Sequence, residues 1–325
     1  MRVFITGASG WIGSAAVDEL LAAGHEVTGL ARSDASAAAL AAKGALVRRG
    51  DLDDLDGIRA GAEAADAVLH LANKHDWADP AASNLAERQA VETIGAALAG
   101  SGRPFLLASG IAGLVQGRAS TEADLSPFHG LESPRGGSEN RALEFVDQGV
   151  TTVSLRFAPT VHGAGDHGFI SVLVDAARRT GVAGYVGDGS NGWAAVHRSD
   201  AGRLIRLGLD RAEPGRILHA VAEESVSTRQ IAEGIGRSLG LPTASIDPAD
   251  AVDHFGFLGT FFSMDLAASS AATREFLGWT PPGRPSSRIS MRVRTSRTRA
   301  LPADSGAASN GPDASVSGPF RGPVG

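Results

Sequence analysis

The stretch FITGASGWIGSAAVDEL, residues 4–20, decides the fold of this chain of 325 residues. Its glycines Gly7, Gly10 and Gly13 follow a run rich in β-branched residues and precede a stretch with helical spacing. A dinucleotide pyrophosphate needs close approach of the backbone, which a Cβ would obstruct, and free N–H groups at a helix N-terminus. A simple strand-to-helix turn would also use glycine, but here a second strand follows, as in a βαβ unit. The pattern therefore predicts a dinucleotide-binding loop.

The first half of the chain alternates short apolar runs with helical stretches, which is typical of a parallel sheet with helices on both faces. Strands are expected at residues 2–6, 25–32, 45–51, 66–72, 104–110 and 151–159. Helices are expected at residues 12–24, 84–102, about 137–148 and 228–242. The last of these helices has Thr228 as its expected N-cap. The prediction is an α/β fold, a Rossmann-type doubly wound parallel sheet with a smaller C-terminal substrate lobe.

We divide the chain into three parts. Residues 1–159 are expected to form an NAD(P)-binding Rossmann domain, and residues 160–280 a substrate lobe with returning sheet elements. From residue 281 to 325 apolar periodicity stops and Pro, Gly, Ser and Arg dominate, so this tail is expected to be disordered. A basic arm that grips an anionic partner is the alternative for the tail, and a solvated tail is favoured.

Composition limits the partners and the compartment. The chain has no cysteine, no signal-peptide pattern at its N-terminus and no uninterrupted run of roughly 18 apolar residues, so we expect a soluble cytoplasmic protein. The net charge is −6, and the arginine-rich tail leaves an acidic body, which argues against a nucleic-acid-binding surface. We expect a small-molecule substrate, no nucleic acid and no membrane, and we consider a homodimer because this fold often forms one.

The end of the second expected strand selects the cofactor. An NAD site usually has Asp or Glu there, accepting hydrogen bonds from the ribose hydroxyls. Here the strand ends in GLARSD, with Arg32 nineteen residues after Gly13. Arginine suits a 2′-phosphate by its charge and its forked donors. Asp34 could serve an NAD ribose if the strand ends later, and Arg32 could be only a surface charge. We predict NADP(H), with NAD as the alternative.

Further positions complete the expected cofactor site. Asp51, in GDLDD, can bond the adenine edge or a backbone amide, or it can cap a helix that begins near Leu55. The expected cofactor contacts are Gly7, Ser9, Gly10, Trp11, Ile12, Gly13, Arg32, Asp51, Leu52, Leu71, Ala72 and Asn73.

Five blocks in this order, TGASGWIG, RGDLDD, VLHLAN, LLASG and LRFAPTVHG, resemble the extended and atypical short-chain dehydrogenase/reductases of the NAD(P)-dependent epimerase/dehydratase type. The similarity covers residues 1–280. It implies a Rossmann domain and a smaller substrate lobe with the nicotinamide in the cleft between them. The segment VHRSDAGRL, residues 196–204, resembles the family's return from lobe to sheet, which makes Asp200 a structural candidate.

The chain departs from this family at the catalytic residues. The family's usual tetrad is Asn, Ser, Tyr and Lys, in which the tyrosine exchanges a proton with the substrate hydroxyl and the lysine lowers the tyrosine pKa. In SPRGGSEN, residues 133–140, Arg135 stands at the tyrosine position and Glu139 at the lysine position. Tyr185 is the single tyrosine, and no lysine follows it at the required spacing. The standard mechanism is therefore absent.

The remaining tetrad positions can be matched with alternatives. Ser109 matches the serine, with Ala108 as the alternative register, and Glu87 falls at the asparagine position. Arg135 cannot usefully release a proton but could polarise a carbonyl or clamp a carboxylate.

The loop ANKHDWADP, after the fourth expected strand, offers another proton source where ligands bind in such sheets. His75 beside Asp76 is the candidate acid, and a solvated polar loop is the alternative reading. The candidate catalytic residues are Ser109, Arg135, Glu139, His75 and Lys74.

Other histidines have plainer interpretations. His162, Asp166 and His167 are expected to line the cleft and not to bind a metal, because no helix aligns them and no fourth ligand is near. His70 is expected to be a hydrogen-bonded core residue.

Two functions remain open. One is an NAD(P)-dependent oxidoreductase or epimerase/dehydratase-like enzyme that acts on a small carbonyl or hydroxyl substrate without the usual Tyr/Lys pair. The other is an NADP(H)-binding sensor or scaffold in which no hydride moves. We favour the enzyme because the family it resembles is overwhelmingly enzymatic and because the loop after the fourth strand supplies an acid.

Overall fold

The computed structural model describes residues 1–74, 76 and 79–282. The chain divides into two compact units, Met1–Arg292 and Val293–Gly325, and all described residues lie in the first unit. The predicted tail, apart from its first two residues, lies outside the described residues. None of the helices in the described ranges combines the length and the apolar character that crossing a bilayer requires.

A seven-stranded parallel sheet forms the centre of the described chain, with strand order β10-β6-β5-β4-β1-β2-β3. The strands are β1 (Arg2–Thr6), β2 (Glu26–Ala31), β3 (Leu46–Arg49), β4 (Ala67–His70), β5 (Pro104–Gly110), β6 (Thr151–Phe157) and β10 (Arg216–Ala220). The order 3-2-1-4-5-6 is that of the Rossmann fold, and β10 extends it beyond β6. The predicted doubly wound parallel sheet is confirmed.

Alternation along the strands sends side chains to two separate cores. In β1, Val3 and Ile5 belong to one core and Phe4 to the other, as the two-residue period of a strand requires. The first core is covered by α1 (Trp11–Ala22) and α7 (Arg198–Asp210), and the second by α3 (Leu55–Ala64), α4 (Pro80–Leu98) and α5 (Ser138–Leu143). The sheet is therefore buried on both faces, which explains its nearly continuous apolar runs.

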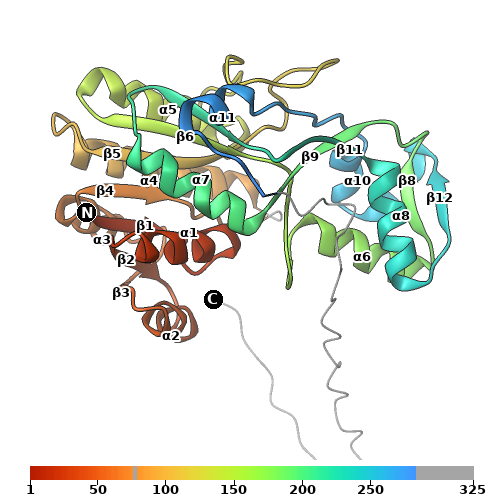
Figure 1. Ribbon diagram of the computed structural model, residues 1–325, viewed down its shortest axis with the longest axis horizontal. Helices are drawn as coiled ribbons and strands as arrows, with labels where there is room; N and C mark the ends of the chain where they lie inside the picture. The colour runs from red at the N-terminus through yellow and green to blue at the C-terminus, as the bar shows by residue number, and fades with distance from the viewer. Residues whose placement is uncertain (75, 77–78, 283–325) are drawn as a thin grey trace, which may run out of the picture. The chain divides into compact units, whose positions relative to one another are not determined.

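Helices α1 and α7 pack side by side on one face of the sheet (Figure 1). Gly202 of α7 makes this contact possible, because a Cβ there would lie 2.8 Å from both the carbonyl carbon and the carbonyl oxygen of Ala15. This packing fixes the first turn of α7 close to the first turn of α1.

Residues after β6 also build two smaller sheets. One contains β7 (Thr160–His162), β9 (Gly192–His197) and β11 (Glu223–Ser227), and the other pairs β8 (Ala183–Val186) with β12 (Thr243–Ile246). The remaining helices are α2 (Asp34–Ala42), α6 (Phe169–Thr180), α8 (Thr228–Leu239), α9 (Ala251–Phe255), α10 (Leu258–Phe262) and α11 (Ala271–Leu277). In the aromatic run at 253–262, Phe255 and Phe262 are buried against each other and Phe262 meets Trp193, whereas Phe257 is exposed.

Several predicted boundaries were wrong. The helix predicted at 137–148 consists of α5 followed by a 3-10 turn (Glu144–Gln148). Helix α5 begins only at Ser138, because Gly136 and Gly137, in the 3-10 turn Pro134–Gly137 before it, adopt positive φ angles. Helix α4 begins at Pro80 and not at residue 84, since Asp79 caps it by accepting from the Ala82 N–H at 2.9 Å.

Two predicted caps are replaced by neighbouring residues. The N-cap of α8 is Ser227, whose hydroxyl accepts from the Gln230 N–H, and Thr228 is the first buried residue of the helix. Helix α3 is capped by Asp54, which accepts from the Gly57 N–H at 2.9 Å, so Asp51 does not cap it.

Two helical glycines should respond oppositely to the same substitution. In Gly202→Ala the new methyl group meets the backbone of Ala15, so the free energy of unfolding should fall by about 1–3 kcal/mol. In Gly234→Ala the nearest atom to the new methyl group lies 4.0 Å away. The higher helix propensity of alanine should therefore raise the free energy of unfolding by up to about 1 kcal/mol. Urea denaturation measures both values, and equal effects would contradict the close packing of α1 against α7.

Candidate dinucleotide and active site

The glycine loop after β1 is a tight cradle. Gly7 has φ +71°, and a Cβ there would lie 2.6 Å from the amide nitrogen of Ala72 and 2.7 Å from the carbonyl carbon of Leu71. A Cβ on Gly13 would lie 2.1 Å from the carbonyl oxygen of Gly7. The loop therefore presses against the chain that leaves β4, and no other residue fits at these two positions.

The first turn of α1 offers its N–H groups to an anion. Gly10 is its N-cap, with an extended backbone and no side-chain cap, and the first turn carries no acidic residue. Ser9 is exposed, and Trp11 and Ile12 are half-buried at the start of the helix. Uncapped N–H groups at a helix N-terminus, approached through glycines, fit the pyrophosphate of a dinucleotide.

The carboxyl ends of β2 and β3 carry arginines. Arg32 follows β2 directly and is exposed, and Arg49 pairs in register with Ala31 at the end of β2. Asp34 is the first residue of α2, and its carboxylate accepts from the Arg49 guanidinium at 2.9 Å. The carboxylate that could have served an NAD ribose is thus already bonded to an arginine.

The predicted adenine-side residues lie in the turn after β3. Asp51 is exposed, and its carboxylate accepts from the Asp53 N–H at 2.9 Å, while Leu52 is buried. The carboxylate of Asp53 in turn accepts from the Lys74 ammonium at 2.7 Å, which joins this turn to the loop after β4. Lys74 is therefore ion-paired, and His75 lies outside the described residues, so the acid expected from this loop stays a prediction.

Glu87 of α4, 1% exposed, is the centre of the cluster beside β4. One of its oxygens accepts from the Asn73 side-chain amide at 2.8 Å and the other from the Arg135 guanidinium at 2.5 Å. His70, at the end of β4, is fully buried and bonds through Nδ1 to the Thr6 hydroxyl at 2.8 Å, which confirms it as a core histidine. Burial lowers the pKa of His70, so the imidazole stays neutral.

Arg135 has a strained backbone. Its φ of +56° makes it the only non-glycine residue with positive φ in the described part of the chain. Such a conformation costs on the order of 1–3 kcal/mol and persists where the surroundings hold it. The turn is held against α4, because Arg88 donates to the carbonyl of Gly136 at 3.0 Å and a Cβ on Gly136 would lie 2.6 Å from the Asn84 carbonyl oxygen. Arg135 is 32% exposed and reaches the ion pair with Glu87 from this turn.

Glu139, one turn further on, is 6% exposed and forms a second cluster at the end of β5. Its carboxylate accepts from the Ser109 hydroxyl at 2.6 Å and from Nε of Arg156 at 2.8 Å. Arg156 is fully buried in β6, where it pairs in register with Ser109, and it also donates to the Asp124 carbonyl at 2.7 Å. Ala108 packs into the core on the other face of the sheet, whereas the Ser109 hydroxyl reaches Glu139, and the match of Ser109 to the family's serine stays a prediction.

In both clusters a buried acid is paired with an arginine, so the charges within each cluster offset one another. Each acid at a tetrad position, Glu87 or Glu139, has an arginine partner, Arg135 or Arg156. Arg156 was missed from the sequence, although a charged residue inside the strand TTVSLRF signals a buried ion that must be paired.

The residues predicted to line the cleft lie around β7. His162 is buried in β7, with its ring centroid 5.5 Å from that of His197, and His167 meets the ring of Trp11 edge-on at 5.2 Å. Asp166 accepts from the Gly168 N–H at 2.7 Å, and burial raises its pKa. Within the described ranges no three His, Cys, Asp or Glu side chains gather as metal ligands.

The sheet order, the glycine cradle and the uncapped helix define a Rossmann-type dinucleotide-binding protein. Residues 3–220 match the model of the NAD dependent epimerase/dehydratase family, and the chain belongs to this family.

Relatives extend the match beyond those residues. An uncharacterized protein of Schizosaccharomyces pombe is 43% identical over 282 residues, which are 86% of this chain and 95% of that protein. An uncharacterized protein of Saccharomyces cerevisiae is 42% identical over 287 residues, with the same coverage of 86% and 95%. The solved structure of the Thermus thermophilus UDP-glucose 4-epimerase in complex with NAD has a similar fold, with a TM-score of 0.66 and 20% identity over 87% of this chain and 94% of that one.

The buried ion pair of Glu139 should matter more for stability than a surface pair. Glu139→Gln leaves the Arg156 charge buried without its counter-ion, so the free energy of unfolding should fall by about 3–5 kcal/mol. In Glu213→Gln the lost partner of Arg216 is exposed, and the change should stay below about 1 kcal/mol. Similar losses in urea denaturation of both variants would show that Arg156 does not depend on Glu139.

His162 should make stability depend on pH. Burial and the neighbouring His197 lower its pKa to about 4, below the ordinary value of about 6.5. As the pH falls through this window the unfolded chain binds a proton first, so stability is complete above about pH 6.5 and is lost towards pH 4. Between pH 7.5 and 4.5, wild type should therefore lose about 2–3 kcal/mol more than His162→Phe. Parallel pH profiles of the two proteins in urea denaturation would contradict this assignment.

Proposed function

We propose that this protein is an NADP(H)-dependent oxidoreductase that acts on a small carbonyl or hydroxyl substrate without a tyrosine–lysine pair. The observation that carries the proposal is the glycine cradle, where Gly7 and Gly13 leave no room for a Cβ beside an uncapped helix N-terminus. Membership of the NAD dependent epimerase/dehydratase family supports it.

The arginines at the ends of β2 and β3 favour NADP(H) over NAD(H). Arg32 is exposed and has no carboxylate partner among the described residues, so its guanidinium can receive a 2′-phosphate. Asp34 would repel that phosphate if its carboxylate were free, but it is paired with the Arg49 guanidinium at 2.9 Å, which reduces the repulsion.

The two clusters beside β4 and β5 can serve hydride chemistry. When bound, the dinucleotide supplies the hydride from its nicotinamide. Arg135 donates one N–H to Glu87. Its other N–H groups can polarise the oxygen of a carbonyl substrate. The Ser109 hydroxyl, which donates to Glu139 at 2.6 Å, would have to turn from this carboxylate to give its proton to the oxygen of the reduced substrate, and would then regain a proton from solvent. Because each acid at the site is matched by an arginine, a neutral carbonyl compound fits better than a permanent anion.

A second function is favoured by the same pairing. The Ser109 hydroxyl donates to Glu139, and both arginines hold carboxylates, so among the described residues no tetrad position presents a free acid. This arrangement suits a sensor or scaffold that binds NADP(H) and changes shape or partner without moving a hydride.

Cofactor titration tests the first part of the proposal. Purified protein should bind NADPH more tightly than NADH, as followed by cofactor fluorescence. Arg32→Glu should weaken NADPH by about 10-fold or more, since a charge-assisted bond to the 2′-phosphate is replaced by repulsion, and should leave NADH within a few-fold. Arg59→Glu reverses an exposed charge on α3 and is the matched control. If neither nucleotide binds, the proposal fails.

Turnover of the NADPH complex with a panel of aldehydes and ketones tests the second part. Arg135→Met should lower kcat by about 100-fold, the usual effect of removing a donor to a developing oxyanion. Arg135→Lys should recover part of this loss, because it retains the charge without the forked geometry. Tight NADPH binding with no oxidation by any compound would favour the sensor.

A further inference from the structure

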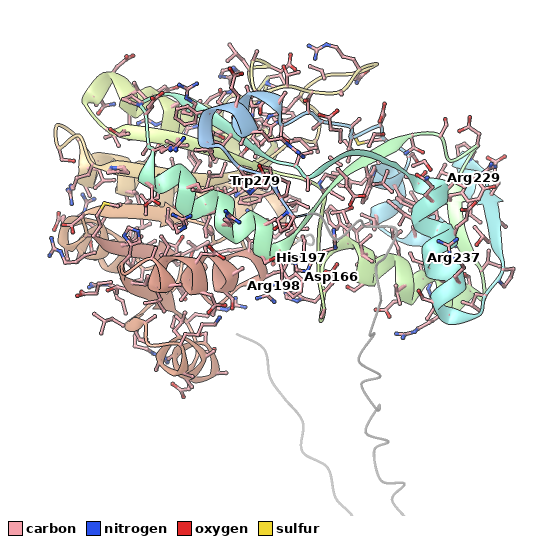
Figure 2. The ribbon with its side chains drawn as sticks, viewed as in Figure 1. Asp166, His197, Arg198, Arg229, Arg237 and Trp279 are labelled. Atoms are coloured by element: carbon pink, nitrogen blue, oxygen red, sulfur yellow. The ribbon has the colours of Figure 1, made fainter. Side chains whose placement is uncertain are left out.

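Arg198 and Trp11 join the start of α7 to the glycine loop. The guanidinium carbon of Arg198, the first residue of α7, lies 4.4 Å from the centroid of the Trp11 ring. Trp11 follows Gly10 directly, and its indole N–H donates to the Val161 carbonyl of β7 at 2.7 Å, which fixes the ring. Figure 2 shows Arg198 next to His197 at the start of α7, close to Asp166.

The guanidinium of Arg198 is held without an acceptor. The side chain is half-buried, and a Cβ on Gly163 would lie 3.1 Å from its Cγ and 3.2 Å from its Cδ, so its stem is confined between Gly163 and Trp11. Within the described chain no carboxylate or carbonyl accepts a hydrogen bond from this guanidinium, whose only partner is the ring. An arginine has five N–H donors, and holding them partly out of water is unfavourable unless an acceptor is bound.

Two acids, Asp166 after β7 and Asp200 in the first turn of α7, do not form an ion pair with Arg198. Asp166 accepts from the Gly168 N–H, and burial raises its pKa, which disfavours a counter-ion. Burial also raises the pKa of Asp200, two residues further along α7. Positive charge is therefore left beside the uncapped N-terminus of α1.

We infer that Arg198 binds the pyrophosphate of the dinucleotide, with Trp11 as the platform that holds its guanidinium beside the glycine loop. This inference rests on the proposed NADP(H) site and adds a side chain from a distant part of the sequence to it. A planar, forked guanidinium matches two phosphate oxygens, and stacking on an indole fixes its plane at little entropic cost. The pyrophosphate is common to NADPH, NADH and ADP-ribose, so Arg198 contributes affinity without selecting among them.

Binding of three nucleotides tests the inference. Arg198→Leu should weaken NADPH, NADH and ADP-ribose by the same factor, about 10- to 100-fold, and leave the NADPH/NADH preference unchanged. Arg203→Leu removes an exposed arginine of the same helix and should stay within about twofold of wild type. Binding of all three nucleotides by Arg198→Leu within twofold of wild type would overturn the inference, and so would an effect confined to the KM of the carbonyl substrate.

Two further variants separate this inference from the proposal on which it rests. Trp11→Leu removes the platform and should weaken ADP-ribose less than Arg198→Leu, and the double variant should bind like Arg198→Leu alone, because both changes act through one guanidinium. Additive losses would overturn the inference. If Arg32→Glu lowers NADPH affinity while Arg198→Leu does not, only the inference fails. If wild type binds no dinucleotide, the proposed function and the inference fail together. Should Arg198→Leu not fold, Arg198→Gln serves in its place with the same expected results.

Discussion

The close contact between the loop after β1 and the first turn of α1 is the constraint on which the other arrangements depend. A methyl group on Gly13 would fall 2.1 Å from the Gly7 carbonyl oxygen, so α1 can approach the sheet only with glycine at this position. With α1 in place, Gly202 lets α7 pack on Ala15, and α7 then carries Arg198 to the ring of Trp11. A single steric requirement thus forms the phosphate cradle and determines which residues surround it.

The carboxyl edge of β4 and β5 obeys a different constraint, the neutralisation of buried charge. An acid at the lysine position cannot lower the pKa of a neighbouring phenol, and Glu139 instead binds Arg156, which is fully buried in β6. The same logic joins Glu87 to Arg135, at the cost of a left-handed backbone at Arg135. At the positions that the sequence matched to the tetrad, the described side chains are thus a guanidinium paired with Glu87 and a serine hydroxyl bonded to Glu139, and no phenol is present among them.

Local patterns in the sequence were sufficient to predict the fold and the cradle. The glycine spacing, the apolar runs and the order of the elements depend on neighbours in the chain, and the sheet follows them closely. What could not be predicted depends on long-range contacts: Arg156 meets Glu139 through the pairing of β5 and β6, and Arg198 meets Trp11 only after α7 packs on α1. The start of α5 at Ser138 depends on the positive φ angles of the two glycines in PRGG, which the sequence pattern alone does not specify. The family resemblance pointed to Arg135, Glu139, Glu87 and Ser109, but it could not show which of them bond to one another and did not find Arg156.

The most direct test of this account follows the hydride itself. Protein loaded with NADPH that carries deuterium at the transferable C4 position should be mixed with a ketone or aldehyde, and the alcohol product analysed by mass spectrometry. The account predicts that deuterium appears on the former carbonyl carbon, although the site has neither tyrosine nor lysine at the tetrad positions. If NADPH binds tightly and keeps all its deuterium with every carbonyl compound, the paired charges at Glu87 and Glu139 have silenced the site, and the protein senses the cofactor instead of using it.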